Sequence, residues 1–266
     1  MINFFRKARK KMSNNNNPIK YLRYAIGEIV LVVLGILFAL QINTWSKERE
    51  NSKKEVFYLR GLKEDLKQDL LALEKSIEFE EMISVTSKRI LTTFHENDRF
   101  LMTDEIIADL NILMASTTPD NHTTIFEELN STGQIGLISA DNLRNQIIQY
   151  YQKQQSLQDS FTTNISGVFQ PIVHPVIQSF SLFNIKSISD SGFLIDSESH
   201  QEIIISKRVF KNVTHLWEDP ATEIRMLNAI NLRLGISLLH RQRMKDMKEK
   251  ATKLLHLVEN RLHKMP

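Results

Sequence analysis

Residues 25–45 read AIGEIVLVVLGILFALQINTW, and this stretch decides how the rest of the chain is organised. No polar side chain occurs from Ile29 to Leu40. Extended outwards to Tyr21 and Trp45, the segment spans roughly 37 Å as a helix, which exceeds a hydrocarbon layer of about 30 Å. Aromatic side chains at both ends are typical of membrane interfaces. The sequence therefore predicts a transmembrane helix.

The charges on either side of this helix predict its direction. Seven Lys or Arg and no acid occur in residues 1–23, whereas residues 46–55 mix both signs. By the positive-inside rule, the N-terminus lies in the cytoplasm and the chain after the helix is exported. A cleaved signal peptide is the alternative, but the apolar core is long and no small-residue cleavage site follows it. An uncleaved signal anchor is favoured.

Three residues of the membrane segment indicate contact with another helix. Glu28 lies about 7 Å from the middle of the span, and acids within membranes usually face protein or water. Gly35 and Ala39 form a small-xxx-small pair, and Glu28, Gly35 and Ile42 recur every seven residues on one face. This pattern predicts self-association. The alternative for Glu28 is a protonated or snorkelling carboxyl that hydrogen-bonds Tyr24 or its copy in a homo-oligomer.

The exported part is typical of long packed helices, because eight Gly and six Pro are few for 266 residues. No breaker except Gly61 interrupts residues 46–96, where a stripe steps by three and four: Leu59, Leu62, Leu66, Leu70, Leu73 and Ile77. Asp219 and Pro220 predict the cap and first residue of a last helix that runs to the C-terminus.

Shorter helices are expected between these two, with caps at Thr103, Thr124 and Ser139 and a stop at Gly133. A proline pair at residues 171 and 175 is expected to end the helix that follows Ser139. Residues 184–206 are the least regular, and their two short apolar pieces predict a small hairpin.

The predicted fold is all-α. A transmembrane helix precedes an elongated antiparallel helical bundle with long first and last helices. The expected domains are a basic cytoplasmic tail (1–20), a transmembrane signal anchor (21–45) and a periplasmic bundle (46–266).

Charge is uneven along the bundle: residues 97–202 carry a net charge of −9 and residues 203–266 a net charge of +7. In an antiparallel bundle, the acidic part lies far from the membrane. The bases of the last helix then lie near anionic lipid or an acidic partner, or form a solvated face: Arg241, Arg243, Lys245, Lys248, Lys250 and Lys253. Their alternation with acids argues against nucleic acid as a partner.

No motif of a known catalytic or cofactor site is present. The chain lacks cysteine, a Gly-rich phosphate loop, G-x-S-x-G and H-E-x-x-H. His256 and His263 share a helical face, and His200 lies near three acids, but neither set has a third ligand at a suitable spacing. We therefore expect no catalytic residue, no metal and no cofactor.

A more specific pattern occupies residues 123–151, TTIFEELNSTGQIGLISADNLRNQIIQYY. It is interpreted as a helix stop, a tight turn and a helix start closed by apolar residues. In a second interpretation the corner is a pocket, with Ser131, Arg144, Tyr150 and Tyr151 as polar groups for a small ligand. An Arg144 that bonds carbonyls at the helix end would fit the structural interpretation equally well.

Together with MINFFRKARKK and residues 24–45, this pattern resembles a family of uncharacterised single-pass membrane proteins of Bacteroidota, chiefly flavobacteria. The shared motifs are Y-A-I-G-E-I-x-L-V-x-x-G-I-L-x-A-L-Q-I-N-x-W, F-x-x-L-x-S-x-G-x-x-x-L-I-S and L-R-x-x-I-x-x-Y-Y. They lie within about the first 155 residues. The resemblance implies a bacterial origin and a single-pass topology, but no activity or cofactor.

The expected function is that of a non-enzymatic protein anchored in the bacterial inner membrane. It is a self-associating scaffold or interaction module, with the lipid bilayer, its own copies and an envelope protein of unknown identity as partners. The alternative is an extracytoplasmic small-ligand sensor or accessory subunit. Such a sensor would signal through a partner, because the predicted cytoplasmic tail has only 20 residues.

Overall fold

The computed structural model describes residues 18–182 and 207–265. The chain divides into two compact units, residues 1–57 and residues 58–266. Every regular element among the described residues is helical, which confirms the all-α prediction. The hairpin predicted at 184–206 lies outside the described residues.

The longest helix, α2 (Pro18–Asn97), has 80 residues and contributes to both units. Proline is absent after its first residue, so no backbone hydrogen bond is lost along it. In the first unit, the large apolar side chains from Ile29 to Leu40 are exposed. An 18-residue window there has a mean hydropathy of 2.5 and no buried residue. Within the described ranges, α2 alone is long and apolar enough to cross a membrane.

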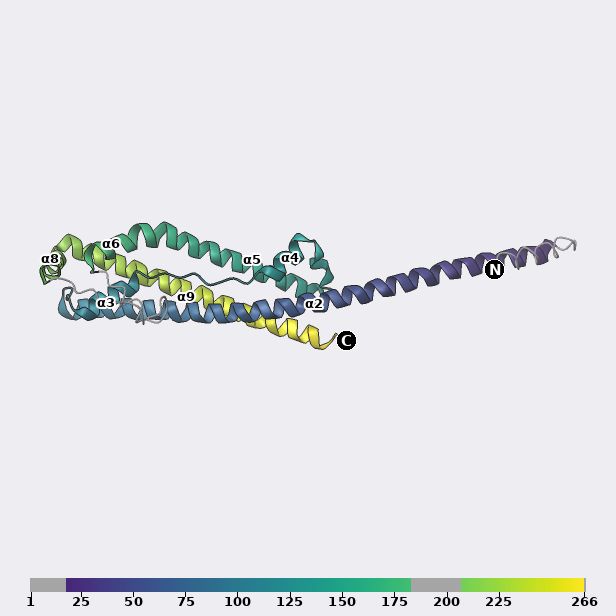
Figure 1. Ribbon diagram of the computed structural model, residues 1–266, viewed down its shortest axis with the longest axis horizontal. Helices are drawn as coiled ribbons and strands as arrows, with labels where there is room; N and C mark the ends of the chain where they lie inside the picture. The colour runs from purple at the N-terminus through teal and green to yellow at the C-terminus, as the bar shows by residue number, and fades with distance from the viewer. Residues whose placement is uncertain (1–17, 183–206, 266) are drawn as a thin grey trace. The chain divides into compact units, whose positions relative to one another are not determined.

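The second unit is built on three helical segments: the part of α2 after residue 57, α5 (Asp141–Asn164) and α9 (Pro220–His263). They lie side by side (Figure 1). Three ion pairs show that α2 and α9 are antiparallel, because the residue number rises in one helix as it falls in the other: Lys63–Glu259, Glu74–Lys248 and Glu81–Arg241. The predicted antiparallel bundle with long first and last helices is confirmed.

Local signals in the sequence set the ends of most helices. Thr103 accepts a hydrogen bond from the Ile106 N–H at the start of α3 (Asp104–Leu113), and Asp219 accepts one from the Thr222 N–H at the start of α9, as predicted. Gly133 has the expected left-handed conformation, with φ of 67°.

Two predicted caps are off by one residue. Thr123, not Thr124, precedes α4 (Thr124–Ser131), and its hydroxyl donates to the Glu127 carboxylate over 2.6 Å. The α5 helix follows Ala140 rather than Ser139. The Ser139 hydroxyl instead accepts a hydrogen bond from Arg261 of α9, 2.6 Å away, so tertiary contact replaces the cap. Between α4 and α5, the short 3₁₀ helix η1 (Gln134–Leu137) completes the corner.

An extended segment, residues 114–123, runs from α3 to α4 and is termed the strap (Figure 1). Its two ends are tied to different helices. Near its start, the Ala115 carbonyl accepts a hydrogen bond from Arg233 of α9 at 3.0 Å. Near its end, the His122 N–H donates to Asp69 of α2 at 2.9 Å. The strap is therefore held to α9 at one end and to α2 at the other.

The helical path after α5 continues past the prolines, which corrects the prediction that it ends there. It proceeds as a π-helix, η2 (Ile165–Val173), and then as α6 (His174–Phe180). Proline lacks an N–H, and its ring clashes with the preceding turn of an α-helix. The wider π turn accommodates Pro171, which lies inside η2. The helix α8 (Lys207–Trp217) follows before α9.

The described residues of the second unit form two separate apolar cores. The first joins residues 58–73 of α2 to α5 and to residues 244–258 of α9. The second joins residues 79–90 of α2 to α3, η2, α6 and residues 226–236 of α9. The buried stripe of α2 runs through both in steps of three and four: Leu59, Leu62, Leu66, Asp69, Leu73, Ser76, Glu80, Ile83, Ser87 and Ile90. Several core positions are therefore polar.

Candidate functional site: a buried polar layer between two cores

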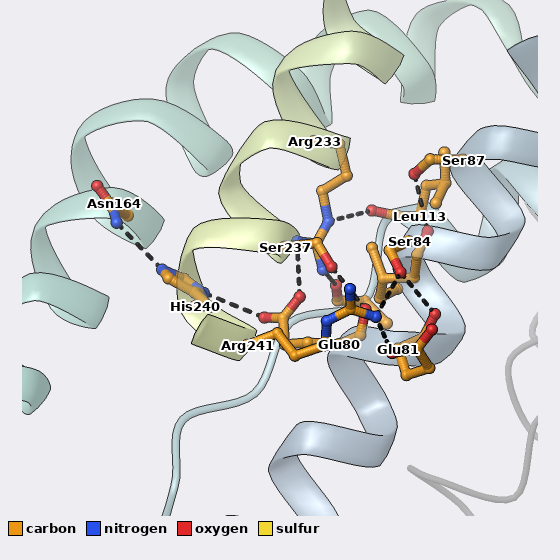
Figure 2. Close-up of polar contacts among 12 residues, drawn as sticks. Glu80, Glu81, Ser84, Ser87, Leu113, Asn164, Arg233, Ser237, His240 and Arg241 are labelled. Atoms are coloured by element: carbon orange, nitrogen blue, oxygen red, sulfur yellow. Dashed lines mark hydrogen bonds and ion pairs between the residues drawn. The ribbon is translucent and has the colours of Figure 1, made fainter. Parts of the chain in front are cut away.

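Four polar side chains are buried together where the two cores meet: Glu80 of α2 and Arg233, Ser237 and His240 of α9 (Figure 2). None of them is more than 2% exposed. They are termed the polar layer. Because an unpaired charge in a protein interior costs several kcal/mol, each group requires partners.

Glu80 is held by three residues of α9. Its Oε2 lies 3.5 Å from Arg233 Nη1, and its Oε1 lies 3.1 Å from His240 Nδ1. The Ser237 hydroxyl donates to the Glu80 backbone carbonyl at 2.6 Å. One turn of α2 is thus fixed to two turns of α9.

The surroundings of Glu80 determine how it titrates. Burial raises the pKa of its carboxyl, but the His240 hydrogen bond and the Arg233 charge outweigh burial and hold the pKa below its ordinary value of 4.5. A depressed native pKa stabilises the fold at pH values above 4.5. That contribution is lost as the pH falls through the lower native value.

Arg233 connects α9 to four other parts of the bundle. Besides its contact with Glu80, its Nε donates to the Leu113 carbonyl at 3.3 Å and its Nη2 to the Ala115 carbonyl at 3.0 Å. Its guanidinium lies 5.0 Å from the centre of the Phe169 ring in η2, a cation–π distance. This single side chain joins α2, the end of α3, the strap and the π-helix.

His240 lies between Glu80 and α5. Its Nε2 is 3.1 Å from Asn164 Nδ2, and its ring stacks on Phe161 with centroids 3.8 Å apart. With this assigned orientation of the Asn164 amide, Nδ2 can only donate, so His240 Nε2 accepts and its Nδ1–H donates to Glu80. The imidazole thus links α5 to α2 through two hydrogen bonds, one to Asn164 and one to Glu80.

The polar layer is closed to substrates in this conformation, because all four of its side chains are buried. Its arrangement fixes the register of the helices instead. Sliding α9 by one turn along α2 would bring an apolar residue of its stripe, Ile230 or Met244, into the layer in place of one polar residue, and would break the present set of contacts around the Glu80 charge. Buried polar groups are known to specify register in helical assemblies in this way.

Asp69 forms a second buried polar centre, inside the first core. Its carboxylate accepts hydrogen bonds from the Tyr150 hydroxyl at 2.7 Å, Gln154 Nε2 at 2.8 Å and the His122 N–H at 2.9 Å, and His122 Nδ1 lies 3.1 Å away. Burial and the Asp69 charge raise the pKa of Tyr150, so its hydroxyl remains a donor. Asp69 therefore ties both α5 and the strap to α2.

The four residues of the predicted corner face different surroundings. Tyr150 and Tyr151 are buried. The Tyr150 hydroxyl is directed to Asp69, and the Tyr151 ring stacks on Phe126 with centroids 4.2 Å apart. Among the described residues, the buried Tyr151 hydroxyl has no hydrogen-bond partner. Ser131 is exposed and donates to a carbonyl of its own helix.

Arg144 lies at the start of α5. Its Nη1 donates to the Ile138 carbonyl at 3.1 Å and its Nη2 to Asp141 at 2.6 Å. These bonds join the end of η1 to the first turn of α5. Arg144 and Ser131 are thus engaged in separate local contacts, while the two tyrosines belong to the core.

Of the residues proposed for membrane-helix contact, Glu28 is partly exposed and Ala39 is exposed. A Cβ atom added to Gly35 would meet nothing within 4 Å, so this face of the helix is open. The three positions fall within about 40° of one another around the helix.

Several bases of α9 pair with acids instead of forming a free basic face. Lys248 lies 2.9 Å from Glu74, and Arg241 pairs with Glu81. Lys253 lies 2.5 Å from Glu249 within α9. The positive excess of the last helix is thus partly matched by acids of α2.

The described residues include no group of three His, Cys, Asp or Glu side chains placed to hold a metal. His256 lies 4.0 Å from Glu259, an ordinary contact within one helix. His200 lies outside the described residues.

Sequence reasoning missed the polar layer, although a signal for it exists. The buried stripe of α9 steps regularly by three and four through Met226, Ile230, Arg233, Ser237, His240, Met244 and Met247. Three consecutive positions of this stripe are polar. A charged residue at a core position of an otherwise apolar repeat indicates a buried partner on another helix.

Comparison with known proteins identifies a family model that matches part of the chain. Residues 28–158, just under half of the chain, match a family of unknown function (DUF6090). The chain is thus similar over this range to an uncharacterised family, and the range includes the Glu28, Asp69 and Glu80 positions. No curated protein and no solved structure matches.

Proposed function

We propose that this protein is a membrane-anchored helical scaffold of the bacterial envelope. It self-associates through its membrane helix, and its bundle binds other envelope proteins. The observation that carries the proposal is the exposed apolar stretch of α2, residues 29–40, none of which is covered by the chain itself. An apolar surface of this length requires lipid or another apolar helix.

The proposed location is the inner membrane, with the N-terminus in the cytoplasm and the bundle in the periplasm. The support for this direction is the run of bases without acids in residues 1–23. A mechanical role for the bundle is supported by its two polar centres, both of which are closed and hold helices together. We therefore propose binding and organisation rather than catalysis as its activity.

The direction of insertion can be tested by cysteine labelling, because the chain has no native cysteine. A single cysteine at Gln155, which is exposed on α5, is expected to react with a membrane-impermeant maleimide in intact spheroplasts. The matched variant Asn15→Cys, in the N-terminal tail, should react only after lysis. Reaction of Asn15→Cys in intact spheroplasts, with protection of Gln155→Cys, would reverse the proposed topology.

Self-association can be tested by oxidative cross-linking in the same cysteine-free background. Gly35→Cys and Ala39→Cys are expected to give disulfide-linked dimers in native membranes, because small residues allow two helices to approach closely. The control is Leu37→Cys, about 200° around the helix from Gly35. Dimer yield should be several-fold higher at residues 35 and 39 than at 37. Equal yields at all three positions would indicate random collision and refute this interface.

A further inference from the structure

A surface cavity of about 410 Å³ lies between α5 and α9, outside the polar layer and next to the Asp69 centre, with which it shares Tyr150. Its volume is in the range of small-molecule sites. One wall comes from α5 and the other from α9, so it runs along the seam of two helices of the second unit. The residues that line it are Gln146, Gln149, Tyr150, Gln152, Lys153, Ser156, Lys250, Lys253 and Leu254.

The charges of this cavity all have one sign. Its lining contains three lysines and no acid. Lys253 is engaged with Glu249 at 2.5 Å, but neither Lys153 nor Lys250 has an ion-pair partner among the residues that the structure describes. Two other lysines that face a neighbouring helix are matched by acids, Lys248 by Glu74 and Lys63 by Glu259. Lys153 and Lys250 differ from them in this respect.

Neutral hydrogen-bonding groups complete the lining. Three glutamines and Ser156 come from successive turns of α5, and each amide can donate to an oxygen atom. The buried side chains of Tyr150 and Leu254 provide apolar surface. Since the Tyr150 hydroxyl is bonded to Asp69, it is not available to a bound molecule. Donors thus predominate over acceptors.

We propose that this cavity binds a small anion through phosphate or carboxylate groups. Lys153 of α5 and Lys250 of α9 contact the anion from opposite walls, since lysine ammonium groups bind such oxygens as point charges. The glutamine amides donate to the remaining oxygens. Occupancy would bridge α5 and α9 at the level of the first core.

Calorimetric titration of the full-length protein in detergent tests this site. The probes are inorganic pyrophosphate and citrate, at about 0.01 M salt, where the screening length is about 30 Å. At least one probe is expected to bind saturably. Saturation by pyrophosphate alone assigns a phosphate ligand, saturation by citrate alone a carboxylate ligand, and saturation by both a site for either group.

The double variant Lys153→Gln and Lys250→Gln should bind at least about tenfold more weakly, which is an increase of one decade or more in Kd. The matched control is Lys75→Gln with Lys245→Gln, which removes the same charge at two exposed residues outside the lining. Its Kd should rise clearly less than that of the Lys153→Gln and Lys250→Gln variant, because these two charges act on the anion only from a distance. Lack of saturation with either probe, or equal weakening in both double variants, would overturn the proposal.

Discussion

Replacing Arg233 by methionine is expected to lower the free energy of unfolding by about 3–5 kcal/mol, because removal of one partner leaves the Glu80 charge buried and poorly compensated. The carbonyls of Leu113, at the end of α3, and of Ala115, in the strap, lose their donor in the same variant. Urea unfolding of the full chain in detergent, followed by far-UV circular dichroism and by fluorescence of the buried Trp217, measures the effect.

Two variants separate the charge effect from a general loss of packing. Arg225→Met changes an exposed arginine of the same helix and should cost no more than about 0.5 kcal/mol. Combining Glu80→Met with Arg233→Met removes both charges, and it should recover at least half of the loss, since apolar replacement of a buried pair is often neutral or stabilising. If the double variant is as unstable as Arg233→Met alone, the charge explanation is wrong.

Replacing Asp69 by alanine is the second large change, with an expected loss of roughly 2–4 kcal/mol in the free energy of unfolding. Each buried donor left without an acceptor costs about 1–3 kcal/mol, and Asp69 serves the Tyr150 hydroxyl and Gln154 inside the core as well as the strap. The same urea titration gives the magnitude.

Hydrogen exchange adds a readout specific to the strap. The His122 N–H donates directly to Asp69, so its protection should fall in Asp69→Ala more than that of amides within α9. Asp159→Ala, an exposed aspartate of α5, is the control and should stay within about 0.5 kcal/mol of the parent. Unchanged protection of the His122 amide would show that the strap is held by other contacts.

The extent of the long helices could be predicted because it depends on local signals. Proline is absent between residues 18 and 119, which permits α2, and the Asp219–Pro220 pair starts α9. Caps at Thr103 and the turn at Gly133 depend on side chains within a few residues. Ser139 was predicted as a cap but contacts Arg261, more than 100 residues away, and such competition is invisible locally.

The interior was predicted less well, because only apolar residues were counted in the stripe of α2. Counting apolar residues alone places Leu70 and Ile77 in this stripe, but both are only partly buried. Their neighbours Asp69 and Ser76 occupy the buried positions instead. Polar residues are not usually expected inside, and their burial depends on donors from other helices. The partners Glu80 and Arg233 are 153 residues apart, so pattern alone could not pair them.

The wide turn of η2 restricts how the length of this chain can vary. Each residue of a helix advances its azimuth by about 100°. Deleting a single residue from η2, with its wide turns kept, would therefore rotate α6 by about that angle, and Ile177, now fully buried in the second core, would turn towards solvent. Helical geometry therefore limits insertions and deletions between α5 and α6. Only those whose number of residues returns Ile177 to its buried orientation are tolerated.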